Sequence, residues 1–518
     1  MINWLKNAIF YEIYPQSFAD TNADGIGDFQ GIIDHLDYIK DLGCNAIWMN
    51  PCFDSPFNDA GYDVRDYCKA APRYGTNADL KRLFDEVHKR DMHILLDLVP
   101  GHSSWEHPWF VASTKPEPNP YSGRYIWTDE VWKGMDGVGS ITGYLRGISQ
   151  RNGCVAVNYY SNQPSLNYGF NEITDPSWQQ GPDSPDALAT REAMKDVMRF
   201  WLQMGCDGFR VDMAGSLVKN DPEQRATIEL WKDFRKFLDA EFPDAAMISE
   251  WSQPDRSLES GFHMDFMLHF GPSHYNDLYH GDDPYFSREG KGNARAFVDY
   301  YEKCYGPTNG KGMICMPSGN HDMERLTHWL DPEEVKIVFA FLLSLPGAPF
   351  IYYGDEIGMK YLPGLTSVEG GFQRTGCRSP MQWDHTVNAG FSQAKPEDLY
   401  IPLDPDPNRP TVEKQLNDPN SIYHEVKKLI AVRQTNKVLQ SEAKVEFIFC
   451  QENTYPLAYR RADDSGSVLI VVNPSGREAS FPYEGKLGEV LYQNGGSVTA
   501  AEGKLTIPAA SAVYIREV

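Results

Sequence analysis

The sequence predicts a parallel (β/α)8 barrel, a TIM barrel, with an inserted subdomain after the third strand and a C-terminal all-β sandwich domain. Three observations lead to this prediction. Eight short apolar runs alternate with helical patterns, one connection is much longer than the rest, and short strands with turns replace this alternation near residue 441. With 518 residues, the chain is long enough for several domains.

Each predicted barrel strand is a short apolar run of the kind that a buried strand requires. These runs lie at 8–15, 46–51, 93–100, 208–213, 245–251, 263–270, 313–322 and 349–358. Helical periodicity follows them at 29–43, 77–91, 187–205, 228–242, 294–305, 333–347 and 421–434. Only the link between the fifth and sixth strands shows no clear helix.

Two long excursions and a change of texture divide the chain. Residues 103–170 are too long for a simple connection in a compact barrel, and 359–419 form a second excursion after the eighth strand. From 441 onward, short strands are separated by Gly, Asn and Asp turns. We therefore expect a (β/α)8 barrel at 1–102 and 171–440, an inserted subdomain at 103–170 and a β-sandwich at 441–518.

Composition narrows the possible partners. The net charge is -24 and the pI about 4.9, which argues against nucleic acid and anionic membranes. Nine cysteines without a CxxC pair indicate reduced thiols in a cytosolic protein. The N-terminal run resembles a first strand, not a signal peptide, and no apolar run reaches the roughly 18 residues of a membrane span. We expect a cytoplasmic protein, with its oligomeric state left open.

Charged residues gather at the predicted carboxyl ends of the barrel strands, where such barrels carry their chemistry. In GFRVDM (208–213), period-2 alternation places Arg210 and Asp212 on the same side of the fourth strand. Glu250 closes the fifth strand. Asp97, His102, His321 and Asp322 stand at the ends of the third and seventh strands.

Two neighbouring carboxyl groups, one ionised and one protonated, are the machinery of glycoside hydrolysis. In retaining enzymes these groups lie roughly 5–5.5 Å apart, a distance that neighbouring strands allow. We predict that Asp212 is the nucleophile, held ionised by Arg210, and that Glu250 is the acid/base. Asp322 would grip sugar hydroxyls. Spacing alone also leaves a metal-dependent hydrolase open, although such a site usually contains more His.

Aromatic side chains suit the apolar faces of sugars. The candidates for this contact are Tyr62, Trp105, Trp127, Tyr168 and Trp251.

Several motifs occur in one order along the chain. They are GCNAIWMNP (43–51), DLVPGH (97–102), QPSLNY (163–168), GFRVDMAG (208–215), ISEW (248–251), SGNHDMER (318–325) and GAPFIYYGDEIGM (347–359). Through these motifs nearly the whole chain resembles glycoside hydrolase family 13, the α-amylase family.

The resemblance implies a role for each matched residue. Asp212 would be the nucleophile, Glu250 the acid/base and Asp322 a transition-state stabiliser. His102, Arg210 and His321 would contact the glucose of the −1 subsite or orient the carboxylates. Asp97 would brace Arg210, and Tyr62 would stack on the sugar. The family also has non-catalytic members, transporter subunits, which this chain is unlike because it keeps all three acids.

Two further segments, NDAGYD (58–63) and RSPMQWD (378–384), resemble the oligo-1,6-glucosidase and α-glucosidase branch. The resemblance implies that Asp59 and Arg378 clasp a terminal glucose, which favours exo-action on short substrates. The chain departs from the family at Gly101, where Asn is common, and at Ser165, where Asp is usual. The departure at Gly101 argues against the calcium site of the inserted subdomain. Met213, after the nucleophile, leaves α-1,4 or α-1,6 preference open.

The loop DTNADGIGD (20–28) places oxygen ligands at alternate residues, the start of an EF-hand-like pattern. The ligands would be Asp20, Asn22, Asp24, the backbone carbonyl of Ile26, and Asp28. The resembling glucosidases bind calcium or magnesium at this loop, away from the active site, so we expect a structural cation and no organic cofactor.

The sequence thus predicts a retaining, exo-acting α-glucosidase for short maltose- or isomaltose-type oligosaccharides. Three alternatives stay open: a glucosyl transferase or isomerase such as a trehalose synthase or sucrose phosphorylase, an endo-acting α-amylase, and a carbohydrate-binding protein on a retained fold. Any turnover would exclude the last.

Overall fold

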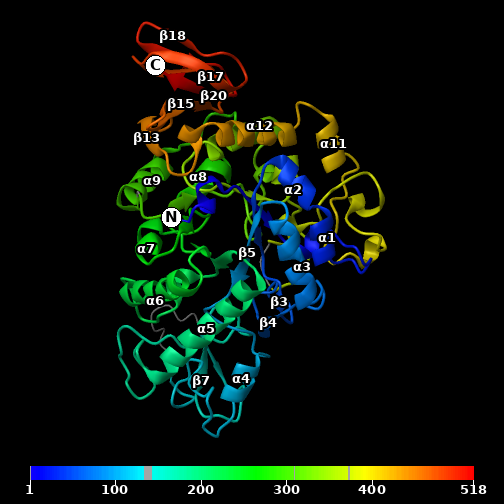
Figure 1. The fold of residues 1–518 in the computed structure, drawn as a ribbon, viewed down its shortest axis with the longest axis vertical. Coiled ribbons are helices and arrows are strands. Elements are labelled where there is room, and N and C mark those ends of the chain that lie inside the picture. Colours follow the sequence, from blue (N-terminus) through cyan, green and yellow to red (C-terminus); the bar gives the residue numbers. More distant parts are fainter. Residues whose placement is uncertain (1, 134–142, 309, 371–373) are drawn as a thin grey trace.

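Eight parallel strands form the centre of the computed structural model, which describes residues 2–133, 143–308, 310–370 and 374–518. Their order in the sheet is β11-β10-β9-β8-β5-β2-β1-β12. A parallel bridge between Pro317 and Phe350, supported by a 2.9 Å hydrogen bond from the Ser318 amide to the Phe350 carbonyl, joins the two edges. The sheet therefore closes into the predicted barrel (Figure 1).

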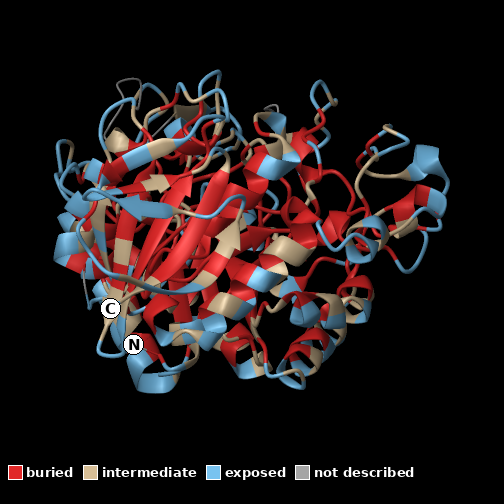
Figure 2. Cartoon of the chain, turned by 90° about the horizontal axis from the view of Figure 1, so that it is seen from above, coloured by how far each residue is buried: buried red, intermediate tan, exposed pale blue. Residues whose placement is uncertain are grey.

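The strands are short and almost fully buried (Figure 2). Their bounds are β1 (Phe10–Ile13), β2 (Ala46–Met49), β5 (His93–Leu98), β8 (Gly208–Val211), β9 (Ala246–Ser249), β10 (Met264–Phe266), β11 (Met313–Cys315) and β12 (Phe350–Tyr352). All eight predicted strands are present, but each is shorter than its apolar run. Beyond the Pro317–Phe350 bridge, residues 319–322, predicted as strand, form the loop that carries His321 and Asp322.

Helices connect the strands. They are α1 (Phe29–Asp34), α2 (Leu36–Leu42), α3 (Asn77–His88), α5 (Pro185–Met204), α6 (Arg225–Glu241), α7 (Pro254–Glu259), α8 (Tyr275–Tyr279), α9 (Arg295–Thr308), α10 (Pro332–Leu342), α11 (Val412–Asn417) and α12 (Ile422–Thr435). Short 3-10 helices lie at Trp4–Asn7, Pro15–Ser17, Ala214–Ser216, Leu326–His328, Asp355–Ile357, Thr375–Arg378, Val387–Gly390, Pro396–Asp398 and Lys437–Leu439.

Two helical details differ from the sequence prediction. The pattern at 29–43 is interrupted at His35, which separates α1 from α2. The link between the fifth and sixth strands does contain a helix, α7. Its six residues span less than two turns, so they are too few to produce a recognisable period.

The segment between β5 and α5 protrudes from the barrel at the opposite end of the long axis from the C-terminal strands (Figure 1). It contains α4 (Pro108–Ser113) and an antiparallel pair, β6 (Gly143–Arg146) and β7 (Cys154–Val157). A bridge between His102 and Ser165 ties its last part to the end of β5. A smaller pair, β3 (Phe53–Asp54) and β4 (Asp66–Ala70), follows β2. The residue boundaries predicted for the three parts stay predictions.

The C-terminal part consists of antiparallel sheets. One has the order β13-β14-β15-β20-β17 and the other β16-β19-β18. Apolar side chains from both sheets, including Leu469, Phe481 and Val513, pack between them, which confirms the predicted sandwich. The strands are β13 (Lys444–Phe449), β14 (Leu457–Asp463), β15 (Gly466–Asn473), β16 (Ala479–Pro482), β17 (Leu487–Asn494), β18 (Thr499–Ala501), β19 (Lys504–Ile507) and β20 (Ser511–Glu517).

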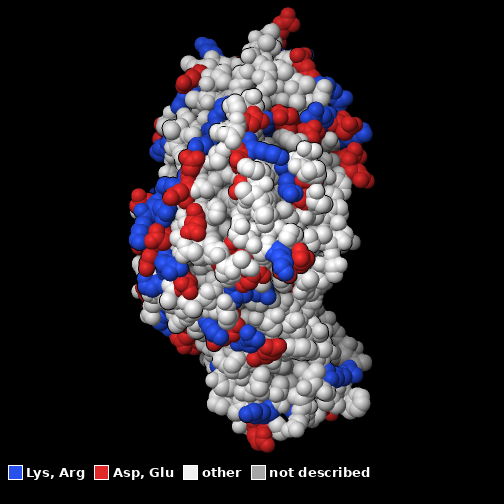
Figure 3. Space-filling view, turned by 90° about the vertical axis from the view of Figure 1, so that its right-hand side faces the viewer, with Lys and Arg blue, Asp and Glu red and all other residues white. Residues whose placement is uncertain are grey.

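All nine cysteines are free thiols. Among the described helices, none combines the length and apolarity that crossing a bilayer requires. On the face drawn in Figure 3, basic side chains are interspersed with acidic ones, so this face carries no continuous basic surface.

Candidate active site

A buried guanidinium lies at the floor of the barrel mouth. Arg210, on β8, is 1% exposed. Its Nη1 lies 2.9 Å from Asp97 Oδ1 and 3.3 Å from Asp212 Oδ1, and its Nη2 lies 2.7 Å from Glu250 Oε1. Strands β5, β8 and β9 are neighbours in the sheet, so three consecutive strand ends bring one carboxylate each to the same cation. The predicted convergence of these side chains is present.

The backbone fixes Asp212 and Glu250 beside each other. The Asp212 amide donates to the Leu98 carbonyl at 2.8 Å, and the Glu250 amide donates to the Val211 carbonyl at 2.9 Å. Between them, Met213 adopts a left-handed conformation (φ 44°), and its amide donates to Glu250 Oε2 at 3.0 Å. Burial, together with the charge of Glu250, raises the pKa of Asp212 well above its usual range. Two carboxyl groups this close disfavour each other's ionisation.

Asp322 has the opposite electrostatic environment. Its Oδ1 accepts from Arg374 at 2.7 Å and from Arg378 at 2.8 Å, and its Oδ2 lies 3.1 Å from His321 Nε2. Burial alone would raise the pKa of Asp322, but the charges of His321 and the two arginines lower it well below the usual value. Asp322 is thus held ionised, whereas ionisation of Asp212 is disfavoured.

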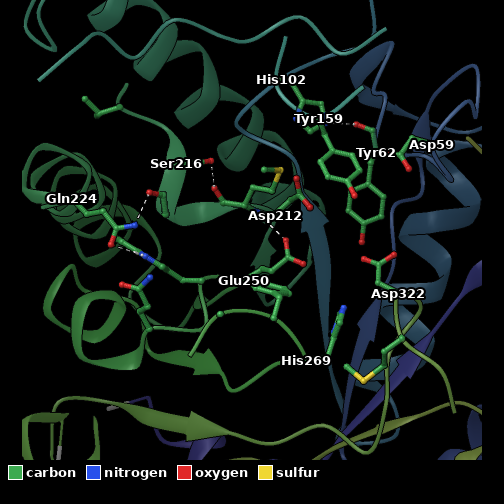
Figure 4. Close-up of a pocket in the computed structure, with 18 of the residues that line it drawn as sticks. Asp59, Tyr62, His102, Tyr159, Asp212, Ser216, Gln224, Glu250, His269 and Asp322 are labelled. Carbon is green, nitrogen blue, oxygen red and sulfur yellow. Dashed lines mark hydrogen bonds between the residues drawn. The ribbon is translucent and has the colours of Figure 1, made fainter. Parts of the chain in front are cut away.

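A cavity of about 1010 Å³ opens above these groups. Figure 4 shows Asp212, Glu250 and Asp322 directed toward one space, with Asp59 and Tyr62 on one side and Ser216 and Gln224 on the other. Of the nine residues predicted to act on substrate, six line this cavity: Asp59, Tyr62, His102, Asp212, Glu250 and Asp322. The other three, Arg210, His321 and Arg378, are buried behind its wall.

Tyr62 and His102 are packed tightly in the wall. The Tyr62 ring is stacked on His321 with 5.4 Å between centroids, and its hydroxyl donates to Asp97 Oδ2 at 3.1 Å. His102 Nε2 lies 3.1 Å from the Tyr62 carbonyl and its Nδ1 2.8 Å from the Asn158 amide nitrogen. Burial lowers the pKa of His102 to about 3, so this imidazole is neutral.

The prediction for the aromatic residues is correct only in part. Tyr62 and Trp251 line the cavity, whereas Trp105, Trp127 and Tyr168 do not. Trp127 and Tyr168 belong to the buried core, and Trp105 is 45% exposed. Residue type alone could not show which of these aromatic side chains face the barrel.

Arg378, predicted to clasp a terminal glucose together with Asp59, is not the cation that lies beside Asp59. Asp59 forms an ion pair with Arg374, not with Arg378. Arg378 is 1% exposed and donates to the His321 carbonyl at 2.7 Å and to Glu369 at 2.9 Å. The segment RTGCRSPMQWD contains two arginines four residues apart, and its sequence does not show which one reaches the cavity.

Other residues of the cavity were not singled out from the sequence. His269, at the end of the sixth strand, is drawn between Glu250 and Asp322 (Figure 4). On the side away from Asp59, Gln224 accepts from the Trp251 indole at 3.2 Å and from Arg256 at 3.1 Å. Gly215 makes this packing possible, because a Cβ there would lie 2.5 Å from the Trp251 indole nitrogen. His269 and Gln224 stand in no pattern that sequence spacing reveals.

Comparison with known proteins agrees with this geometry. The family model described as "Alpha amylase, catalytic domain" matches residues 12–442. The chain belongs to glycoside hydrolase family 13, the α-amylase family. It is therefore an enzyme of the glycoside hydrolase type, with glycosidase or glycosyl-transfer activity on an oligosaccharide substrate.

Some similar proteins are named as glucosidases and others as synthases of disaccharides. The chain is 33% identical to "Trehalose synthase/amylase TreS" of Mycobacterium tuberculosis, over 91% of this chain and 82% of that protein. It is 30% identical to the oligo-1,6-glucosidase of Heyndrickxia coagulans, over 93% and 94%. The trehalulose synthase MutB of Pseudomonas mesoacidophila has a similar structure, with a TM-score of 0.83, 27% identity and 100% coverage of both chains.

The loop at 20–28 was predicted to hold a cation. In the structure Asp20 accepts from the backbone amides of Asn22, Ala23 and Gly25, Asn22 from Asp24, and Asp24 from Ile26. Asp28 caps α1 by accepting from Gly31 at 2.7 Å. Within the described ranges, no group of three or more His, Cys, Asp or Glu side chains is arranged to hold a metal ion. As placed, these carboxylates accept hydrogen bonds from backbone amides.

Calcium or magnesium at this loop stays a prediction from the alternating oxygen ligands. We expect excess chelator to lower the melting temperature, because a cation bound only to the folded chain stabilises it. Elemental analysis of the purified protein and thermal melts with and without EDTA would measure this. An unchanged melt together with absence of metal would remove the site.

Proposed function

We propose that this family 13 enzyme is a retaining, exo-acting α-glucosidase that removes terminal α-linked glucose from short oligosaccharides. The observation that carries the proposal is the Arg210 guanidinium, which lies between Asp212 and Glu250 at the floor of a cavity bounded on one side by the Asp59–Arg374 ion pair. A nucleophile and an acid/base beside each other support retention, and a charged wall favours the end of a sugar chain over its interior.

In the proposed reaction, Asp212 attacks the anomeric carbon while Glu250 gives its proton to the departing glycosidic oxygen. The glucosyl group is then bound covalently to Asp212, and the leaving sugar departs with its new hydroxyl. Glu250, now a carboxylate, takes a proton from water, whose oxygen attacks the same carbon and releases glucose and Asp212. The ionised Asp322 would hold sugar hydroxyls and stabilise the positive charge that develops on the ring.

The structure around Asp59 supports a pocket for a terminal sugar. Arg374 contacts Asp59 through Nη2 and Asp322 through Nη1, and Gln163 donates to Asp59 Oδ2 at 2.7 Å. Sugar hydroxyls that enter this end therefore meet fixed acceptors and donors. An internal unit of a long chain would have to continue through this ion pair, which argues against the endo-amylase alternative.

Transfer of glucose to a second sugar is the other candidate function. The cavity continues away from Asp59 past Gln224, Trp251 and Phe270, so it has room for a sugar acceptor beside the glucosyl group. Relatives named trehalose synthase and trehalulose synthase support this candidate, and a MutB mutant was crystallised with the substrate sucrose. Linkage preference, cytoplasmic location and oligomeric state stay predictions or open questions.

A product time course separates the two candidates. We expect maltotriose or isomaltotriose to release glucose one unit at a time, because water reaches the covalent intermediate. Chromatography of samples taken over time would measure the products. The faster trisaccharide would give the linkage preference. Sucrose and trehalose should be tested separately. Rearranged disaccharides or longer products with little free glucose would contradict hydrolysis and support transfer.

Removal of either carboxyl function should abolish most turnover. We expect Asp212→Asn and Glu250→Gln each to lower kcat by at least about 10³-fold, since each removes a group that reacts. Melting temperature and circular dichroism would show that the fold persists. Asp54→Asn is the matched control, because Asp54 is a buried carboxylate paired with Arg65 at 2.8 Å outside the cavity. Near-normal turnover of either variant would refute the role given to that residue.

The structure assigns the Asp59 contact to Arg374. We expect Arg374→Ala to lower kcat/KM on maltose or isomaltose by about 10- to 100-fold, the loss expected for hydrogen bonds to charged groups. Relative activity on longer chains should rise because the charged wall opens. The exposed ion pair of Arg516 with Glu489 offers a control in Arg516→Ala. An unchanged kcat/KM in Arg374→Ala would show that this wall does not contact the terminal sugar.

A further inference from the structure

One buried acid below the cavity, Glu12, has no role in the proposed mechanism. Glu12 is on β1 and is 0% exposed. A carboxylate without a partner would be very unfavourable in such an environment. Glu12 does not line the cavity and cannot touch a sugar there. Its contacts show which group it acts on.

Glu12 is hydrogen-bonded to His321. Its Oε1 lies 2.9 Å from His321 Nδ1, while the other ring nitrogen, Nε2, lies 3.1 Å from Asp322 Oδ2 and 2.7 Å from the Tyr62 hydroxyl. One carboxylate therefore faces each nitrogen of the same ring. An imidazolium donates from both nitrogens, whereas a neutral imidazole donates from only one.

His321 lies among three carboxylates, two arginines and a second histidine. The carboxylates come from β1, β5 and the loop after β11. The two arginines nearby form ion pairs with the last two of them. The titratable or charged groups facing His321 are Glu12, Tyr14, Tyr62, Asp97, Arg210, His269, Asp322 and Arg378. Burial would lower the pKa of His321, but Asp322 and Glu12 raise it to about 9.

Asn50 also contacts both members of the pair. Its Nδ2 lies 3.1 Å from Glu12 Oε1 and 2.9 Å from His321 Nδ1. In the charged arrangement this amide donates to Glu12. In a neutral arrangement it would donate to Nδ1, and Glu12 would carry the proton.

Hydrogen bonding alone does not require an acid at position 12. Gln has the same shape and also offers an acceptor oxygen to His321, so the carboxylate adds only charge. The second oxygen of Glu12 has no hydrogen-bond partner among the described residues. The Glu12 carboxylate therefore acts mainly on the His321 ring, the ionisable group to which it is hydrogen-bonded.

We propose that Glu12 is a positioning residue that holds His321 as an imidazolium, and that His321 in turn keeps Asp322 ionised and aimed into the cavity. The line Glu12–His321–Asp322 runs from the barrel interior to the sugar site. The part that concerns Asp322 rests on the proposed function. The charge state of His321 does not, and it can be measured without substrate.

The decisive measurement is an NMR titration of the His321 ring in protein with isotope-labelled histidine, assigned by the signal lost in His321→Gln. We expect wild-type His321 to stay charged through neutral pH and to titrate near pH 9. In Glu12→Gln the midpoint should fall by about one pH unit or more, because a neighbouring opposite charge is lost. A wild-type ring that is neutral at pH 7, or a midpoint unchanged in Glu12→Gln, would overturn the proposal.

Glu356→Gln is the matched control. Glu356 is also 0% exposed in the barrel, but it accepts from Tyr11 at 2.8 Å and Tyr38 at 2.6 Å, away from the cavity. The Glu356→Gln variant should alter the melting temperature without moving the midpoint of the His321 titration. If Glu12→Gln does not fold, Glu12→Asp retains the charge, and the wild-type titration alone still decides the state of His321.

The pH profile of kcat/KM tests the link to catalysis. The alkaline limb should move to lower pH in Glu12→Gln and stay in place in Glu356→Gln. An equal loss at every pH would mean that Glu12 only supports the fold. A shifted NMR midpoint with an unshifted alkaline limb would confirm the charge state and refute its catalytic consequence. A different reaction found in the product time course would leave the NMR result intact.

Discussion

The active site depends on one buried cation with three carboxylate partners. Arg210 cannot lose its charge at any ordinary pH, and its Nη1 and Nη2 are occupied by Asp97, Asp212 and Glu250. Because these partners come from three neighbouring strands, the guanidinium also helps to fix where those strands end relative to one another. Removing it would leave several buried acids uncompensated, which is far more unfavourable than the loss of one hydrogen bond.

A second set of charges controls Asp322. Arg374, Arg378 and His321 surround this carboxylate and lower its pKa. Burial and the charge of Glu250 raise the pKa of Asp212. The site therefore contains acids whose pKa values are shifted in opposite directions, which lets chemically similar groups take different roles. Glu12, on the far side of His321, extends this second set into the barrel interior.

The two ends of the cavity differ in character, and this difference frames the choice between hydrolysis and transfer. The Asp59–Arg374 end is charged and its groups are fixed by ion pairs. The other end is lined by Trp251, Phe270 and the amide of Gln224. In the proposed mechanism hydrolysis and transfer use the same reacting groups, so they differ in what the second end admits to the glycosyl intermediate.

The sequence by itself determined the eight strands, seven of their helical connections, the C-terminal sandwich and the gathering of acids at the barrel mouth. Each of these follows from local periodicity or from the rule that barrel strand ends converge. Only the tertiary structure decided that Arg374 and not Arg378 pairs with Asp59, that Trp127 and Tyr168 belong to the core, and that Glu12 lies against His321. These are contacts between residues tens to hundreds of positions apart, and no local pattern encodes which of two similar side chains is within reach.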